Sequence, residues 1–156
     1  MINLDIPGHE AITVAHVTFD YNGTLAVDGY LVAGLKERLV ALAKLVEVHI
    51  LTADTFGLVR EQCGDLPVTI EIFSKDNISQ KKKAFVEALG GATNIAIGNG
   101  NNDREMFAES RLAIVVMGTE GCCVPSLLAA DIVVSSPLDA LDLLLNTDRL
   151  VATLRT

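Results

Sequence analysis

The sequence predicts an α/β fold in which a mainly parallel sheet lies between two layers of helices. Strand-like and helix-like segments alternate along the chain, as in parallel strands joined by helical crossovers. Half of the 156 residues are apolar and only 21% are charged, so one core of ordinary size can be buried. With five Phe, two Tyr and no Trp, that core is aliphatic, as strands buried on both faces require. We therefore expect a three-layer, Rossmann-like fold and a single domain over residues 1–156.

The first segments predict a hairpin, a helix and a strand. Residues 2–6 and 12–19 are strand-like and are separated by the turn residues Pro7-Gly8-His9, which predicts an N-terminal hairpin over about residues 1–19. In residues 31–45, leucines recur at three- and four-residue spacings, the pattern of an amphipathic helix. A strand follows at residues 46–51.

The alternation continues to the end of the chain without repeats or low-complexity linkers. Helices are expected over 56–63, 78–89, 103–109, 124–130 and 138–145, and strands over 68–73, 95–97, 112–117 and 132–134. Gly90 and Gly91 should end the second of these helices in a left-handed cap. Ligands of such a sheet bind beyond the carboxyl ends of the strands, so functional residues are expected at those ends.

Composition excludes several classes of partner. The formal charge of −8 and a pI near 4.7 exclude a nucleic-acid binder, which needs clustered Lys and Arg. No apolar run reaches the length of a membrane span, and the first residues do not resemble a signal peptide, which predicts no membrane insertion and a cytoplasmic protein.

Cysteines and histidines show no ligand spacing. The cysteines are odd in number and two are adjacent, which favours reduced thiols that pack in the interior: Cys63, Cys122 and Cys123. The histidines have no partner pattern and are predicted to be structural: His9, His16 and His49.

Two predicted strands end in polar residues that could bind a ligand. Asp20 follows a buried strand and precedes a tight Gly turn, so its carboxylate is exposed to a ligand on a rigid backbone; a simple Asx turn is the alternative. Thr52 ends the strand at 46–51, where a hydroxyl can bind a phosphoryl oxygen, although Thr52, Asp54 or Thr55 could equally cap a helix.

Two further segments add a basic cluster and a polar loop. Lys81, Lys82 and Lys83 are the only dense basic cluster, and because helical neighbours fan out, one can face a site while another faces water. Residues 98–103, GNGNND, follow a strand and resemble a dinucleotide loop. Asp103 replaces its third Gly and would repel a pyrophosphate, and no P-loop is present, so a nucleotide cofactor is not expected.

The order of these segments resembles the haloacid dehalogenase superfamily of phosphotransferases. Its first motif, D-x-D-G-T-L, resembles residues 20–25; its second, a strand ending in Ser or Thr, resembles the segment ending at Thr52; and its fourth, G-D-G-x-N-D, resembles residues 98–103. The pattern P-x-x-K-x-x-x-V-x-x-L of P-type ATPases aligns with residues 79–89 and selects Lys82. The resemblance covers about residues 12–135, and the soluble P-type ATPase-like phosphatases are the group it suggests.

This resemblance implies a Mg²⁺-dependent phosphatase with an aspartyl-phosphate intermediate. Asp20 would be the nucleophile, and Lys82 would counter its charge and hold the phosphoryl group together with Thr52. Asn102 would orient these groups and contact phosphate. The implied metal ligands are Asp20, the backbone carbonyl of Asn22, Asp103 and, where the family has an aspartate, Asn99.

Two amides depart from the family pattern. Asn22 stands where phosphatases carry the aspartate that protonates the leaving group, so we expect slow turnover and a preference for good leaving groups. Asn99 removes a negative charge from the metal site, which predicts a high Mg²⁺ requirement. The alternative is a catalytically weak or inactive binding module, for example a partner of a transporter or a phosphoprotein.

No cap domain fits in the sequence. The two intervals that hold caps in this superfamily are already filled by predicted helices and strands, and residues 26–30 allow only a small flap. Since capless members act on macromolecules or close the site with a neighbouring subunit, the resemblance suggests a phosphoprotein or small phosphorylated substrate, and a homo-oligomer in the latter case.

Overall fold

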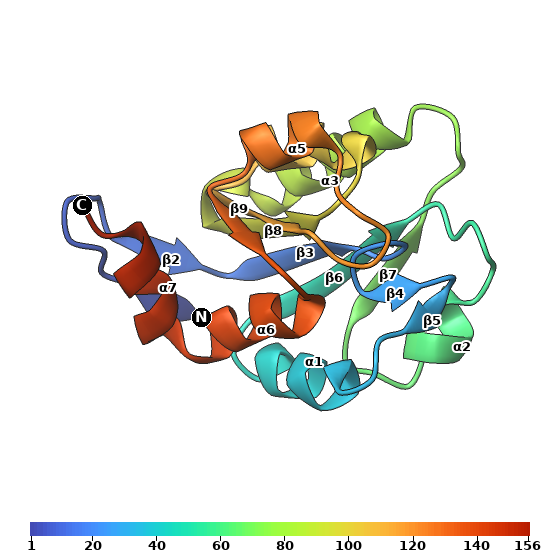
Figure 1. The fold of residues 1–156 in the computed structure, drawn as a ribbon, viewed down its shortest axis with the longest axis horizontal. Coiled ribbons are helices and arrows are strands. Elements are labelled where there is room, and N and C mark those ends of the chain that lie inside the picture. Colours follow the sequence, from blue (N-terminus) through green and yellow to red (C-terminus); the bar gives the residue numbers. More distant parts are fainter.

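A six-stranded parallel sheet forms the centre of the molecule (Figure 1). The structure is a computed structural model that describes residues 1–156. From one edge of the sheet to the other, the strands are β10 (Ile132–Val134), β9 (Leu112–Val116), β8 (Asn94–Gly98), β3 (His16–Asp20), β6 (Glu47–Thr52) and β7 (Thr69–Ile72). All five pairings are parallel, which confirms the predicted α/β class.

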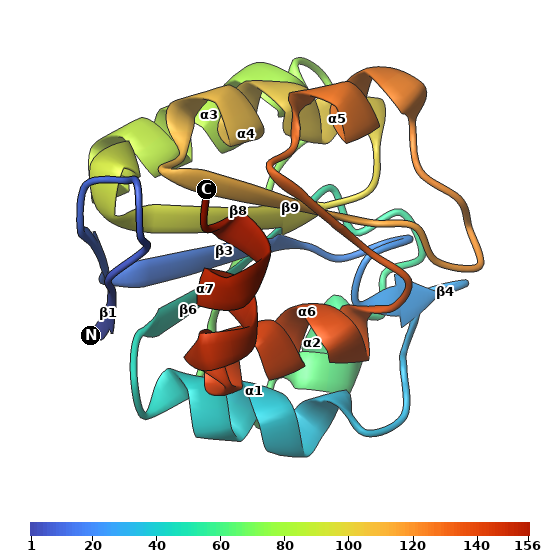
Figure 2. The same cartoon turned by 60° about the vertical axis from the view of Figure 1, so that its left-hand side comes forward.

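Helices cover both faces of this sheet (Figure 2). One face carries α3 (Ile78–Leu89), α4 (Arg104–Glu109) and α5 (Val124–Ala129), and the other carries α1 (Leu35–Ala43), α2 (Val59–Cys63), α6 (Pro137–Leu145) and α7 (Thr147–Leu154). The larger aliphatic core lies on the α1 and α6 side, and a smaller apolar cluster lies under α3 and α4. No helix is both long and apolar enough to cross a membrane.

The N-terminal segment differs from the prediction. β1 (Ile2–Leu4) pairs antiparallel with β2 (Ile12–Val14), but the strand expected over 12–19 breaks at Ala15 into β2 and β3. The break is set by tertiary hydrogen bonds, because the Ala15 amide donates to the Thr93 carbonyl and its own carbonyl accepts from the Glu47 amide. The unpredicted helix α7 packs its buried Leu150 against the same core.

The region between β3 and α1 is a small hairpin rather than a cap. β4 (Ala26–Val27) pairs with β5 (Tyr30–Leu31), so the helix expected over 31–45 spans only 35–43. The helix expected over 56–63 is likewise shorter, because residues before Val59 form a turn. Helix α3 has the predicted bounds and ends at Gly90, whose φ of 89° is left-handed, as expected.

The topology directs attention to the carboxyl end of β3. From β3 the chain builds β6 and β7 on one side of the sheet and then returns to build β8, β9 and β10 on the other. At such a switch point the loops after adjacent strands diverge and leave a crevice. Two short 3-10 turns flank this region of the chain, Gly91–Thr93 before β8 and Asn101–Asp103 after it.

Candidate active site

A buried ion-pair cluster lies at the carboxyl end of β3. Lys82, from α3, donates hydrogen bonds to Asp20 Oδ1 at 2.6 Å and to Asp103 Oδ1 at 2.7 Å. The exposed fractions are 7% for Asp20, 1% for Lys82 and 0% for Asp103, so water screens these charges little. The cluster holds two carboxylates and one ammonium, and therefore has one uncompensated negative charge.

Backbone amides of the loop after β8 hold the carboxylate of Asp103 in place. Its Oδ2 accepts hydrogen bonds from the backbone amides of Asn99, at 3.0 Å, and Gly100, at 2.9 Å. Gly98 allows this approach, because a Cβ at that position would lie 2.4 Å from Asp103 Oδ2. Gly98 is therefore needed for the Asp103 carboxylate to take this position.

Burial and charge shift the pKa values of the cluster in a consistent direction. Burial first, and the charge of Asp103 second, raise the pKa of Asp20 to about 6 against the opposing effect of Lys82. Burial alone would lower the pKa of Lys82, but Asp103 and Asp20 outweigh it and raise that pKa above the ordinary lysine value. Lys82 is thus a fixed cation, and a second cation near Asp20 would lower the energy of its ionised form.

Thr24 connects the first motif to the polar loop. Its hydroxyl lies 3.1 Å from Asp20 Oδ2 and 3.2 Å from Asn99 Oδ1. The Asn99 amide nitrogen donates to the Gly121 carbonyl at 3.1 Å, so both ends of this side chain are held. Gly23, with φ of 81°, lies so close that a Cβ there would be 2.4 Å from Asn99 Nδ2.

Thr52 lies at the end of β6 with its hydroxyl oxygen already in use as an acceptor. The Asp54 amide donates to Thr52 Oγ1 at 2.9 Å, which leaves the hydroxyl proton available to donate elsewhere. Thr52 does not cap a helix; Asp54 instead accepts from the amides of Leu58 and Val59 at the start of α2. Of the three residues that could have capped this helix, Thr52, Asp54 and Thr55, Asp54 is the one whose side chain accepts from the first amides of α2.

These side chains surround one open pocket of about 490 Å³. All but one of its lining residues are polar or glycine: Asp20, Asn22, Thr52, Ala53, Thr55, Ser79, Lys82, Asn99, Gly100, Asn101 and Asn102. Asn22 Oδ1 is buried without a hydrogen-bond partner. Asn102 contacts Lys82 only at 3.5 Å. The pocket therefore suits a small, strongly polar ligand rather than an apolar one.

The structure brings every predicted site residue to this pocket or directly beneath it, and it separates the three lysines. Lys81 pairs with the exposed Asp76 at 3.3 Å and Lys83 with Glu87 at 3.5 Å, so only Lys82 points inward. Sequence reasoning assigned no site role to Thr24 or Ser79, and it considered Thr55 only as a helix cap. Ser79 precedes Lys82 by three positions, a spacing that shares one helix face and could have indicated it.

The oxygen atoms of the site fit a hard divalent cation. Asp20 and Asp103 supply carboxylates, Asn22 and Asn99 supply carbonyl oxygens, and no sulfur or imidazole lines the pocket. Mg²⁺ prefers such ligands. Two observations favour a cation here: Asn22 Oδ1 has no hydrogen-bond partner, and the Asp20–Lys82–Asp103 cluster has one uncompensated negative charge.

Comparison with known proteins identifies sequence relatives, although no family model matches the chain. Two uncharacterised proteins of Methanocaldococcus jannaschii are 54% identical over 61 residues and 49% identical over 42 residues. The first match covers 39% of this chain and 66% of the relative, just under two thirds of its length. The second covers 27% of this chain and 96% of the relative.

Solved structures share the fold at low sequence identity. The cobalt-bound deoxy-D-mannose-octulosonate 8-phosphate phosphatase of Haemophilus influenzae is 16% identical, with a TM-score of 0.73 over 92% of this chain and 94% of that one. The phosphatase of Moraxella catarrhalis for the same compound, solved with a magnesium ion, phosphate and the sugar acid KDO, is 19% identical, with a TM-score of 0.71 over 91% and 94%.

A third structure carries the superfamily name. A haloacid dehalogenase-like hydrolase of Streptococcus pneumoniae is 13% identical, with a TM-score of 0.59 over 83% of this chain and 97% of that one. At these identities the likeness is one of fold, and it extends over nearly the whole length of both chains. This chain belongs to the family of the second Methanocaldococcus jannaschii protein, and it has the haloacid dehalogenase superfamily fold.

Proposed function

We propose that this chain is a Mg²⁺-dependent phosphohydrolase that works through an aspartyl-phosphate on Asp20. The observation that carries the proposal is the buried carboxylate of Asp20, held 2.6 Å from the Lys82 ammonium at the base of a polar pocket. Carboxylates with strongly perturbed pKa values in clefts are frequent functional groups. With a pKa near 6, Asp20 is mostly ionised at pH 7 and can act as a nucleophile.

The residues around Asp20 support two successive transfers. In the first, a carboxylate oxygen of Asp20 forms a bond to phosphorus as the bond to the leaving group breaks. In the second, water attacks the same phosphorus and releases Asp20. Lys82 and the Thr52 hydroxyl can donate to the phosphoryl oxygens, which gather negative charge in both steps.

Mg²⁺ would be held by the carboxylates of Asp20 and Asp103 and the backbone carbonyl of Asn22, with Asn99 beside them. When bound, it would offset the repulsion between an anionic phosphate and the carboxylate of Asp20. Asn99 supplies only a neutral oxygen, and the Thr24 hydroxyl 3.2 Å away can donate its single proton either to that oxygen or to Asp20. We therefore infer a weak metal site and a high Mg²⁺ requirement.

Asn22 sets the substrate class. An amide cannot donate a proton to a leaving group at useful pH, and general acid catalysis is worth about 10² to 10⁴ in rate. Acyl, aryl and anhydride phosphates lose their leaving groups without that help, whereas alkyl phosphates depend on it. The similar solved structures are named as phosphatases of a sugar phosphate. We propose that this chain instead favours substrates with good leaving groups.

The open pocket also bears on partners and location. No inserted domain covers it, since only the β4–β5 hairpin separates β3 from α1. We propose that a phosphoprotein or a second copy of the chain closes it over the substrate. All three cysteines are free, and we propose a cytoplasmic protein.

A second candidate function is phosphate-dependent binding without turnover. The two amides favour it, because Asn22 and Asn99 replace groups on which family chemistry depends. In that case the same pocket would hold a phosphorylated ligand or the phosphorylated segment of a partner such as a transporter. The persistence of the Asp20–Lys82–Asp103 cluster favours the enzyme.

A phosphorylation assay separates the two. The wild-type chain is incubated with Mg²⁺ and either acetyl phosphate or an aryl phosphate, and both phosphate release and acid-stable phosphoprotein are measured. Asp20→Asn is the matched control, because it keeps the shape and removes the nucleophile. We expect slow release and an accumulating phosphoprotein in the wild type only. If the wild type gives neither phosphate release nor a phosphoprotein, the enzyme proposal fails and the binding module is favoured.

A further inference from the structure

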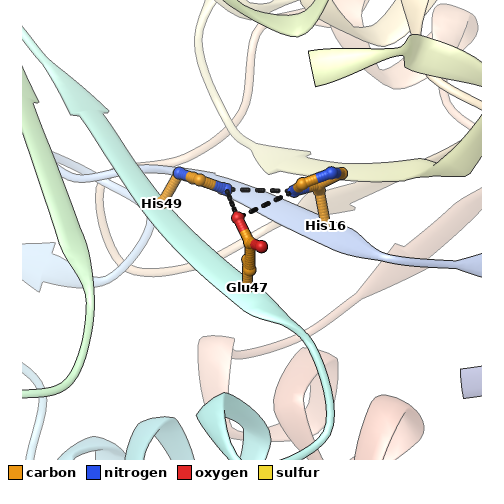
Figure 3. A group of neighbouring side chains, drawn as sticks. All are labelled: His16, Glu47 and His49. Atoms are coloured by element: carbon orange, nitrogen blue, oxygen red, sulfur yellow. Dashed lines mark hydrogen bonds and ion pairs between the residues drawn. The ribbon is translucent and has the colours of Figure 1, made fainter. Parts of the chain in front are cut away.

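A group of side chains of the types that commonly bind metal ions lies at the opposite end of the sheet from the Asp20 pocket (Figure 3). His16 opens β3, and Glu47 and His49 lie two positions apart on the neighbouring β6. The parallel register places His16 directly beside Glu47. Because side chains alternate along a strand, Glu47 and His49 share one face of the sheet, and all three side chains converge.

The three converging atoms form a compact triangle. His16 Nδ1 lies 3.3 Å from His49 Nε2 and 3.5 Å from Glu47 Oε2, and the His49 and Glu47 atoms are 3.9 Å apart. A point equidistant from all three lies about 2.1 Å from each, which matches the bond lengths of Zn²⁺ to imidazole nitrogen and carboxylate oxygen. The side chains need little movement to act as ligands.

The surroundings leave room for a further ligand. His49 is 5% exposed, whereas the Glu47 side chain is 72% exposed. The His16 side chain is also partly open to solvent, at 16% exposed. Water can therefore reach the triangle from the solvent side and fill a fourth position.

The buried ring of His49 can present the required lone pair. Its Nδ1 has no hydrogen-bond partner, so nothing on that side forces the proton onto Nε2. The ring is held between His16 and Phe85, with centroid distances of 5.5 Å to each. This packing fixes the direction of Nε2 before any ligand arrives.

We propose that His16, Glu47 and His49 form a binding site for a divalent transition-metal ion of the zinc class, separate from the Asp20 pocket. Two imidazoles and one carboxylate suit Zn²⁺, Co²⁺ or Ni²⁺, while Mg²⁺ prefers oxygen ligands only. Asp20 lies four positions after His16 along β3, which is about 13 Å. The ion is therefore too far away to contact the phosphate, and it ties β3 to β6.

The site exists only in the folded chain, because its ligands come from two strands that the sheet brings together. Binding to the folded state alone raises stability. The competing interpretation is a hydrogen bond between the two rings with Glu47 as a surface ion-pair partner, in which case no metal is taken up.

Cobalt binding distinguishes the two interpretations. The untagged full chain is treated with a chelator, dialysed, and titrated with Co²⁺ in excess Mg²⁺, which occupies the Asp20 pocket. We expect one equivalent of Co²⁺ with the visible absorption of a four-coordinate nitrogen and oxygen site, displaced by Zn²⁺. Zn²⁺ should also raise the thermal midpoint.

The variants locate the ion. Glu47→Gln removes one ligand at an exposed position and should weaken Co²⁺ binding about ten-fold or more, as should His16→Asn. Glu61→Gln, an equal charge change at an exposed position of α2, and Asp20→Asn should both bind Co²⁺ as the wild type does. Because Glu47 is exposed, this test does not depend on whether the histidine variant folds.

Three results would overturn the proposal. The first is the absence of a cobalt spectrum, and the second is wild-type affinity in Glu47→Gln. The third is a signal that disappears in Asp20→Asn or carries the charge-transfer band of thiolate, which would place the ion in the phosphate pocket or on Cys122 and Cys123. None of these outcomes bears on the phosphorylation assay, so the two proposals fail independently.

Discussion

Strands β3 and β6 carry a polar cluster at each end, and the two clusters differ in how their charges are treated. At the carboxyl end, Asp20 is almost fully buried and depends on Lys82, 2.6 Å away. At the amino end, the charge of Glu47 is 72% exposed, and the two histidines beside it are uncharged in their ligand form.

The difference shows that burying a charged side chain makes it depend on a counter-ion within the protein. A buried carboxylate loses its hydration, and Lys82 must be shared between Asp20 and Asp103, so the carboxyl end is electrostatically strained when no second cation is present. The amino end keeps its charge in water and needs no internal counter-ion. Substitutions should therefore have large effects at the first cluster and small ones at the second.

The largest expected effect follows removal of the shared cation. Lys82→Met leaves two carboxylates buried without compensation, and we expect the free energy of unfolding to fall by about 3 to 5 kcal/mol, with phosphoryl transfer abolished. Lys81→Met, which breaks only an exposed pair with Asp76, should cost about 1 kcal/mol or less. Equal losses in urea unfolding would show that Lys82 has no special electrostatic role.

The next effect tests the missing proton donor. Asn22→Asp restores a carboxyl group at the pocket, and we expect turnover of alkyl phosphates to rise by about 10² to 10⁴. Aryl phosphates should respond much less, because their leaving groups depart unprotonated. Steady-state rates with a matched alkyl and aryl pair measure the ratio; an unchanged ratio would mean that Asn22 does not limit the reaction.

Asp20→Asn should stabilise the metal-free protein in a pH-dependent way. Folding raises the pKa of Asp20 from 3.8 to about 6, so the folded state disfavours the ionised form. Below pH 3.8 the carboxyl is protonated in both states and the variant gains nothing; the gain appears between pH 4 and 6 and is complete above it. We expect about 1 to 3 kcal/mol at pH 8 in urea unfolding with a chelator. A gain independent of pH would exclude the carboxylate as its cause.

Asn99→Asp should lower the Mg²⁺ requirement by about ten-fold through added negative charge at the metal site. It also removes the donation to the Gly121 carbonyl, so some stability should be lost without metal. The half-saturating Mg²⁺ concentration for phosphoprotein formation is the measurement, with Asn101→Asp in the same loop as the control. A shift of the same size in both variants would indicate a general charge effect.

Local patterns predicted the fold wherever hydrophobic spacing and a terminating residue agreed. Helix α3 has the expected bounds because its apolar positions and Gly90 define both ends. The break at Ala15 could not be predicted, since the apolar run continues through it and only contacts with Thr93 and Glu47 end the strand. Helix α7 was missed because its eight residues are mostly polar outside Leu150, Val151 and Leu154.

The Asp20 cluster and the His16–Glu47–His49 cluster also differ in whether local sequence patterns could predict them. Apart from Ser79 and Lys82 on α3, the residues of the Asp20 pocket follow strands in short contiguous motifs. Because the ends of parallel strands meet at one edge of the sheet, the grouping of these residues could be predicted; their roles remain predictions. The histidines were predicted to be structural because no spacing in the sequence pairs them, and the structure adds that His16 and His49 contact each other. Their contact depends on the register between β3 and β6, and no local spacing encodes that register.

The smallest expected effect is at that second cluster. With a chelator present, Glu47→Gln should change the free energy of unfolding by no more than about 0.5 kcal/mol, because its side chain is 72% exposed and water replaces its contacts with both histidines. Urea unfolding of the chelated variant beside Lys82→Met measures the contrast. A loss of several kcal/mol would mean that Glu47 already stabilises the metal-free fold, and the two ends of β3 would then be alike rather than opposite in how they treat charge.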